Sequence, residues 1–220
     1  MRILPAVLES DVEALQEKVA TVAADGRLER VQIDLLDGTL APKLTVTPYD
    51  LINVDFGELK ADFHIMTQDP LDYVWELAAQ GETIPVHAVA GQLERMSEQE
   101  AFLQAVRERG WKAGLALDLE TPLDSIDDGA WKLLDQVVLM AVPLGRQGQT
   151  FDEIVLEKLH ELAQIEREYK IRPEVVVDGG VKTAELGQLD AHGVNSVAVG
   201  SFLWQGDFHT RLDELLAAAE

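Results

Sequence analysis

Short apolar segments recur eight times along the chain, and each is followed by an amphipathic helix or an irregular crossover. The expected strands are residues 2–8, 31–35, 61–66, 83–87, 112–117, 136–142, 174–178 and 196–199. Near-continuous apolar runs of this kind are typical of parallel strands, which are buried on both faces. The pattern therefore predicts an α/β fold, a closed (β/α)8 TIM barrel, with residues 1–220 in a single domain.

An open, doubly wound sheet is the main competing fold. Such a sheet usually has fewer strands and a glycine-rich turn after the first one. Here the first turn is Leu8-Glu9-Ser10, which contains no glycine. Ser10 and Glu13 have the spacing of a capping box, with Ser10 as the expected N-cap, and Gly26 is expected to end that first helix.

The composition excludes several classes of function. The chain has 18 Lys and Arg residues against 40 Asp and Glu, a net charge of −22, which repels nucleic acids and anionic membrane surfaces. It has no cysteine, so thiolate metal sites and cysteine nucleophiles are excluded. No apolar run approaches the ~20 residues of a membrane-spanning helix. We expect a cytoplasmic protein that acts on a small molecule.

Polar residues stand at the ends of several apolar strands. In β/α barrels the carboxyl ends of the strands carry the active site. Gln32 and Asp34 are two residues apart and so share one face of their strand. The third, fourth and seventh expected strands contribute His64, His87 and Asp178. Taken singly, each is more often a cap or a hydrogen-bonded core residue. As a set, Asp34, His64 and Asp178 predict a cation site, because two carboxylates and an imidazole suit Zn, Mn or Fe.

Glycines directly follow the last two expected strands. Gly179 and Gly180 come after the seventh strand, and Gly200 with Ser201 after the eighth. Backbone N–H groups in such turns bind phosphate, and the loops after strands seven and eight are the usual phosphate site of this architecture. The simpler interpretation is a tight turn at each position. Because two such turns lie in adjacent loops, the pattern favours a phosphate site.

A set of motifs in fixed order resembles one known family. The motifs are PAVL (5–8), QIDLLDG (32–38), DFHIM (62–66), KAGLAL (112–117), TPL (121–123), MAVPLGRQGQTF (140–151) and VDGG (177–180). Their order and spacing are similar to those of the ribulose-phosphate 3-epimerases, over essentially the whole chain. The resemblance implies a ribulose-phosphate-binding barrel of the pentose phosphate pathway. It also implies C3 epimerisation that interconverts D-ribulose 5-phosphate and D-xylulose 5-phosphate.

The resemblance also implies roles for individual residues. Asp34 and Asp178 match the family's acid/base pair, which moves protons on opposite faces of the substrate while a divalent metal holds a cis-enediolate. The divalent metal would be Mn, Fe, Zn or Mg. Asp34, His64 and Asp178 match the positions of the family's metal ligands, and Gln32 stands at the position of a fourth. The implied phosphate and substrate residues are Met140, Gly145, Gly148, Gly179, Gly180, Gly200 and Ser201. Family members form dimers or rings, which implies a homo-oligomer.

Three positions depart from the family pattern. Ala6 replaces a serine near the substrate, Gln32 a histidine ligand, and Leu36 a methionine. A glutamine offers only a neutral oxygen, which weakens zinc binding and favours harder ions such as Mg or Mn. The alternative function is therefore a catalytically impaired barrel that only binds a sugar phosphate. A Schiff-base aldolase is a weaker alternative, because Lys60 and Lys112 stand at the starts of their strands.

Overall fold

The computed structural model describes residues 1–144 and 148–219, and its strands close into a barrel. The strands are β1 (Arg2–Val7), β2 (Arg30–Leu36), β3 (Lys60–Met66), β4 (Val86–Gln92), β5 (Lys112–Leu117), β6 (Gln136–Met140), β7 (Glu174–Asp178) and β8 (Ser196–Val199). Each strand pairs in parallel with the next, and β1 pairs with β8, which confirms the predicted (β/α)8 fold.

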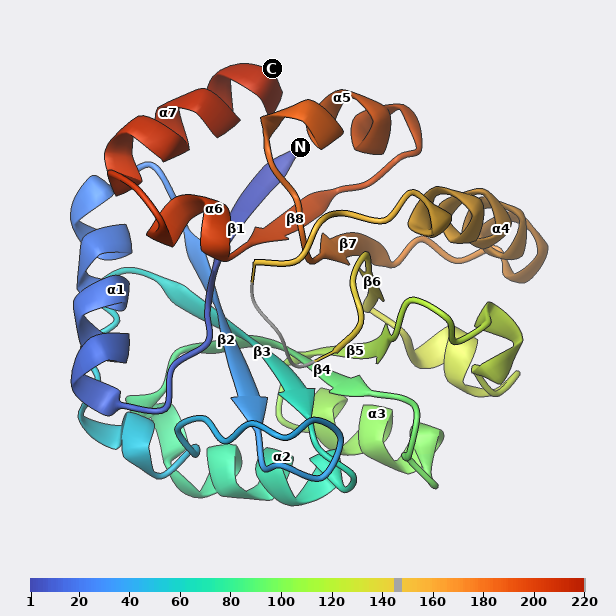
Figure 1. Ribbon diagram of the computed structural model, residues 1–220. Coiled ribbons are helices and arrows are strands. Elements are labelled where there is room, and N and C mark those ends of the chain that lie inside the picture. The colour runs from blue at the N-terminus through green and yellow to red at the C-terminus, as the bar shows by residue number, and fades with distance from the viewer. Residues whose placement is uncertain (145–147, 220) are drawn as a thin grey trace.

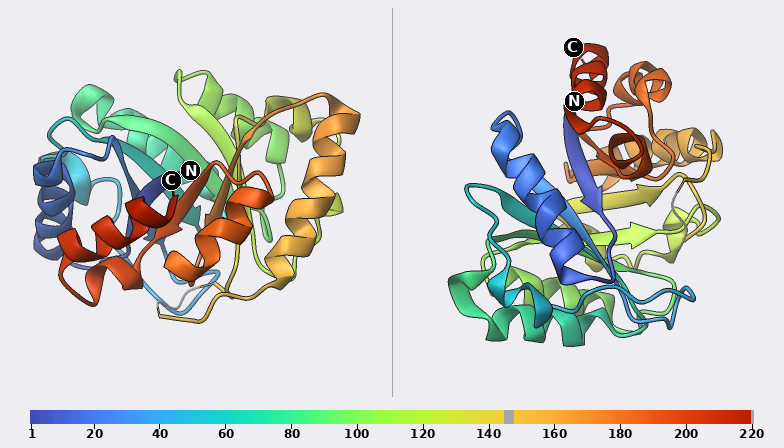
Figure 2. Two further views of the ribbon diagram at one scale, coloured as in Figure 1. Left: turned by 90° about the horizontal axis from the view of Figure 1, so that it is seen from above. Right: turned by 60° about the vertical axis from the view of Figure 1, so that its left-hand side comes forward.

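Helices surround the barrel, as Figure 1 shows and the views of Figure 2 confirm. They are α1 (Val12–Asp25), α2 (Pro70–Ala79), α3 (Gln99–Arg107), α4 (Ile154–Tyr169), α5 (Thr183–Ala191), α6 (Ser201–Trp204) and α7 (Phe208–Ala219). Short 3-10 turns are η1 (Asp50–Asn53), η2 (Gly81–Thr83), η3 (Leu123–Ser125) and η4 (Ala130–Leu133). The crossover from β5 to β6 consists of η3 and η4 with their loops.

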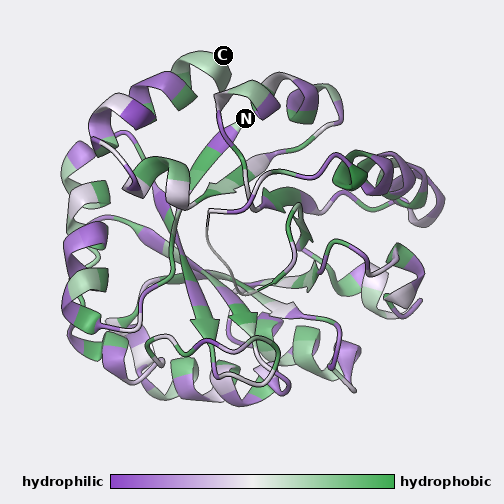
Figure 3. Ribbon diagram, viewed as in Figure 1, coloured by the Kyte–Doolittle hydropathy of each residue, from purple (hydrophilic) through white to green (hydrophobic). Residues whose placement is uncertain are grey.

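The described residues form three hydrophobic clusters, and two of them hold these layers together. The larger lies between the strands and the surrounding helices, and the helices accordingly alternate between hydrophobic and hydrophilic residues along their length (Figure 3). The smaller fills the barrel interior and is rich in alanine: Leu4, Ala6, Ala90, Ala116, Val138, Val176 and Ala198. Because this inner layer is apolar, the polar residues of the interior are divided between the two ends of the barrel.

The fourth strand lies further along the chain than the predicted 83–87. Residues 81–83 form η2, and β4 runs from Val86 to Gln92. Pro85 has no N–H to donate to a sheet, and it precedes the strand. The shift moves His87 to the start of β4 and brings Gln92 to its carboxyl end.

The first helix also begins differently from the prediction. Its N-cap is Asp11 rather than Ser10, and the Asp11 carboxylate accepts a hydrogen bond from the Ala14 N–H at 2.9 Å. Gly26 does end the helix, with a left-handed φ of 72°. Among the described helices, none is long and apolar enough to cross a membrane.

Candidate metal and acid/base site

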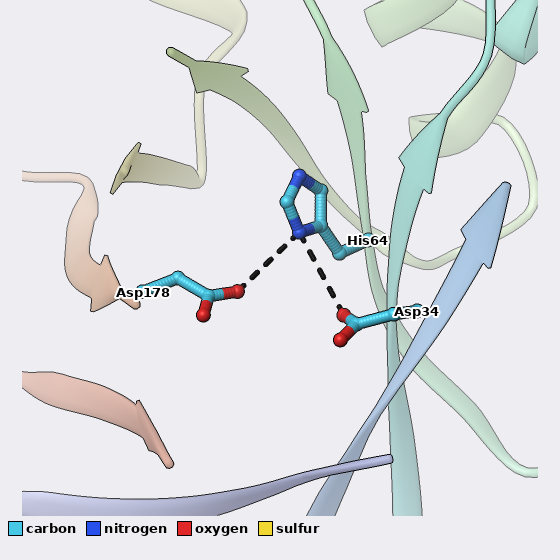
Figure 4. Close-up of side chains that lie close together, drawn as sticks. All are labelled: Asp34, His64 and Asp178. Atoms are coloured by element: carbon cyan, nitrogen blue, oxygen red, sulfur yellow. Dashed lines mark ion pairs between the residues drawn. The ribbon is translucent and has the colours of Figure 1, made fainter. Parts of the chain in front are cut away.

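Three side chains from separate strands meet at the carboxyl ends of the barrel strands. Asp34 on β2 lies beside His64 on β3 in the sheet register, and Asp178 ends β7. Figure 4 shows both carboxylates turned toward the same ring nitrogen of His64. The His64 Nδ1 atom is 3.4 Å from Asp178 Oδ2 and 3.7 Å from Asp34 Oδ1. The structure therefore brings together the three residues predicted to converge.

Gln32 links the two carboxylates by hydrogen bonds. Its Nε2 group donates to Asp34 Oδ1 at 2.8 Å and to Asp178 Oδ2 at 2.7 Å. An amide nitrogen does not bind metal ions, so Gln32 supplies a ligand only if its amide turns to present the oxygen. In the arrangement observed, Gln32 holds Asp34 and Asp178 at a fixed separation.

Burial and neighbouring charge shift the titration of this site. Burial, and then the charge of Asp178, raise the pKa of Asp34 to about 7. Burial disfavours the charged form of His64, but the carboxylates of Asp178 and Asp34 outweigh it and raise the pKa of His64 to about 9. A carboxyl group that titrates near 7 suits proton transfer at neutral pH.

The donor set fits a divalent cation. One ligand atom from each of Asp34, His64 and Asp178 lies within 4.8 Å of the others. The His64 Nδ1 atom is buried and has no hydrogen-bond partner among the described residues, and it faces the two carboxylates. Two oxygens and one nitrogen from the protein leave a coordination position open, as metal sites that perform chemistry do.

Gln92 and Glu94 extend this site outward, and neither was predicted. Gln92 Oε1 lies 2.8 Å from His64 Nε2, and Gln92 Nε2 donates to Glu94 Oε2 at 2.7 Å. They were missed because the fourth strand was predicted to end at residue 87, whereas β4 ends at Gln92. His87, which was predicted here, lies at the opposite end of the barrel with its Nδ1 atom 2.8 Å from Asp62 Oδ1.

The predicted phosphate residues line a small cavity beside the carboxylates. The cavity has a volume of about 70 Å³, and its lining includes Ala6, Asp34, Leu36, His64, Met140, Gly148, Asp178, Gly179, Gly180, Gly200 and Ser201. Gly145, which was also predicted to bind substrate, lies outside the described residues. Ligand pockets usually measure about 300–1,000 Å³, so the described part of this cavity is small.

Gly179 and Gly180 have a steric reason to be glycine as well. Both have positive φ angles, 108° and 68°. A Cβ atom on Gly180 would collide with the backbone of Phe151, and one on Gly179 with the side chain of Val142. Glycine is thus required here for the loops after β6 and β7 to approach each other, whether or not a phosphate binds.

Solved structures with the same architecture include two enzymes of low sequence identity. A mutant tryptophan synthase α-subunit from Pyrococcus furiosus superposes with a TM-score of 0.70 at 17% identity, covering 98% of each chain. Phosphoribosyl anthranilate isomerase from Thermus thermophilus superposes with a TM-score of 0.65 at 15% identity, covering 99% of this chain and 98% of that one. At such identities the likeness shows the fold alone.

Sequence comparisons identify the family. The chain is 32% identical to the ribulose-phosphate 3-epimerase of Escherichia coli K12 over 216 residues, which are 97% of this chain and 93% of that enzyme. It is 29% identical to the Bacillus subtilis enzyme of the same name over 219 residues, 98% of each chain. The model of the ribulose-phosphate 3 epimerase family matches residues 2–204. The chain therefore belongs to the ribulose-phosphate 3-epimerase family.

Proposed function

We propose that this protein epimerises a ketose phosphate at C3, interconverting D-ribulose 5-phosphate and D-xylulose 5-phosphate or a related pair. Family membership supports an epimerase that acts on carbohydrate phosphates. The observation that carries the proposal is the pair of carboxylates, Asp34 from β2 and Asp178 from β7, which face a shared centre at the mouth of the barrel.

Inversion at a carbon requires proton transfer on both of its faces. One aspartate removes the C3 proton, and the other delivers a proton from the opposite side. Asp34, whose pKa is raised to about 7, is able to hold or release a proton at neutral pH. Gln32, which donates to both carboxylates, keeps them in place between turnovers.

A divalent ion is the proposed cofactor, with Asp34, His64 and Asp178 as its ligands. When bound, it supplies Lewis-acid stabilisation of the negative charge that develops on the substrate oxygens. Mn, Fe, Zn and Mg are the candidates. Gln32 in place of a histidine removes one imidazole nitrogen from the donor set, which favours the harder ions Mg and Mn.

The glycine turns are the proposed phosphate site. Gly148, Gly179, Gly180, Gly200 and Ser201 line one side of the cavity that also contains the carboxylates. The net charge of −22 repels a phosphate at long range, so binding must come from nearby donors such as the backbone N–H groups of these turns. We also propose a cytoplasmic homo-oligomer, without a nucleic-acid or membrane partner.

Deuterium incorporation tests this function. Incubating the protein with ribulose 5-phosphate in deuterated water, with Mn, Fe, Zn or Mg supplied, should place deuterium at C3 and produce xylulose 5-phosphate. Asp34→Asn and Asp178→Asn are the matched controls and should form xylulose 5-phosphate about 10²–10⁴-fold more slowly. Thermal stabilisation by the sugar phosphate without any exchange would instead support the impaired, binding-only barrel. The retained pair of aspartates argues against that alternative.

A further inference from the structure

Three polar side chains form a line that leads outward from the candidate metal site. His64 Nε2 lies 2.8 Å from Gln92 Oε1, and Gln92 Nε2 donates to Glu94 Oε2 at 2.7 Å. The other oxygen, Glu94 Oε1, accepts from the backbone N–H of Asp118 at 2.6 Å. Gln92 is fully buried and His64 is 1% exposed, so water does not replace the contact between these two side chains.

Glu94, the outermost residue of this line, fixes the direction of each hydrogen bond in it. A carboxylate has only acceptors, so the Gln92 side chain must turn its NH₂ group toward Glu94. Its oxygen then faces His64 and requires a donor, which makes Nε2 the nitrogen that carries the proton. In the neutral imidazole the lone pair is consequently on Nδ1, the atom that faces Asp34 and Asp178.

We propose that Gln92 and Glu94 are positioning residues that hold His64 with Nδ1 presented to the divalent ion. The inference rests on the metal dependence proposed above. The ring nitrogen that binds a metal is commonly selected by the hydrogen bond of the other nitrogen, and removal of that partner weakens metal binding about 10–100-fold. Gln32 does not share this role, because its amide contacts the carboxylates and not His64.

Metal titration without sugar tests the proposal. The full-length protein, stripped of metal, is titrated with Co²⁺ and followed by visible absorption. Gln92→Leu should weaken Co²⁺ binding about 10–100-fold. Glu94→Gln retains the shape but lets the Gln92 amide turn either way, so a smaller loss is expected. Gln136→Leu is the control, since Gln136 is an equally buried amide at the start of β6. It should leave Co²⁺ affinity unchanged.

Nitrogen NMR of the Zn²⁺-bound protein provides a readout that simple destabilisation would not produce. In the wild type, the His64 ring should carry its proton on Nε2 and the metal on Nδ1. In Glu94→Gln the ring proton should exchange faster with water, because its acceptor is no longer held. Metal on Nε2 in the wild type, or Co²⁺ affinity preserved in both variants, would overturn the proposal.

The outcome separates this inference from the proposed function. A wild-type protein that binds Co²⁺ through Nδ1 but does not exchange deuterium at C3 would remove the function and leave the positioning role intact. If the wild type epimerises ribulose 5-phosphate but Gln92→Leu binds Co²⁺ as tightly as the wild type, the proposed function stands and the positioning role is removed. A wild type that binds none of these ions overturns the positioning role.

Discussion

The two ends of the barrel both contain buried charged side chains, and the same strands supply them. At the amino ends, Arg30 of β2 contacts Asp62 Oδ2 of β3 at 3.0 Å and Glu174 Oε1 of β7 at 2.5 Å. At the carboxyl ends, the same three strands contribute Asp34, His64 and Asp178. The two clusters thus differ in composition and not in the elements that position them.

The two ends of the barrel differ in how their buried charges are paired. At the amino ends burial opposes ionisation of Glu174, but hydrogen bonds from Arg30 and Ser196 outweigh it and lower the pKa of that carboxyl. At the carboxyl ends burial and Asp178 together raise the pKa of Asp34. Ion pairs such as those at the amino ends stabilise the fold. A buried carboxylate beside another carboxylate, as at the carboxyl ends, is retained where a cation or a substrate completes the site.

Cavity size does not favour the end of the barrel that contains the candidate site. A hollow of about 850 Å³ lies at the amino ends, lined by charged residues that include Arg2, Arg30 and Glu174. The cavity at the carboxyl ends measures about 70 Å³. The smaller one is lined by Asp34, His64 and Asp178, which each offer a ligand atom within 4.8 Å of the others. In this protein the convergence of possible ligand atoms, rather than volume, indicates the candidate site.

Replacing either aspartate of the carboxyl-end cluster should have the largest effect on activity. Asp34→Asn and Asp178→Asn remove a group that transfers a proton, so kcat for epimerisation should fall about 10²–10⁴-fold. A coupled assay of xylulose 5-phosphate formation measures this, and circular dichroism checks the fold. A variant that keeps a tenth of the wild-type kcat would contradict the acid/base roles.

Breaking the amino-end cluster should affect stability instead. Arg30→Met removes the buried cation that Asp62 and Glu174 share, so the free energy of unfolding should fall by about 3–5 kcal/mol. Urea denaturation measures the change. Asp34→Asn is the comparison, and it should leave stability equal or higher, because it relieves repulsion from Asp178. Equal losses in the two variants would remove the distinction between the two ends.

Restoring an imidazole at Gln32 should strengthen zinc binding. In Gln32→His a nitrogen ligand replaces an amide that donates to both carboxylates. The Zn²⁺ dissociation constant should fall about tenfold or more relative to that of Mg²⁺, since imidazole is the softer ligand. Competition with a chromogenic chelator measures both constants. Gln32→Leu, which offers no ligand, should not raise the preference for zinc.

The pH dependence of stability provides a further test of the carboxyl-end cluster. Folded Asp34 keeps its proton to about pH 7, whereas the unfolded residue loses it near 3.8. The folded state therefore binds more protons in this interval, and the contribution of Asp34 to stability declines as pH rises from about 4 to 7. His64, with its pKa raised to about 9 from 6.5, extends the decline toward pH 9.

Urea denaturation of the metal-free protein at several pH values checks this. The relevant quantity is the difference between the wild type and Asp34→Asn, because other groups titrate in the same range. Stability of the wild type relative to the variant should decrease between pH 4 and 7. A difference that stays constant over this interval would show that Asp34 titrates normally.

The fold and the convergence of Asp34, His64 and Asp178 were predictable because their signals are local. Apolar runs identify strands, and the two-residue period of a strand places Gln32 and Asp34 on one face. The fourth strand was misplaced because its residues are small. A Cβ on Gly91 would collide with Phe102, and Ala90 lies in the narrow barrel interior. Packing, and not strand propensity, selects these residues.

By itself, then, the sequence determined the order of strands and which polar residues end them, since both depend on neighbours along the chain. Tertiary structure decided how those residues pair. β2 and β7 are not adjacent in the sheet, so Gln32 reaches Asp178, 146 residues away, only across the closed barrel. The same closure brings Asp178 close to Asp34, which together with burial raises the pKa of Asp34, and it faces His64 Nδ1 toward both carboxylates. Hydrogen-bond direction and charge balance depend on such long-range contacts, which no local pattern records.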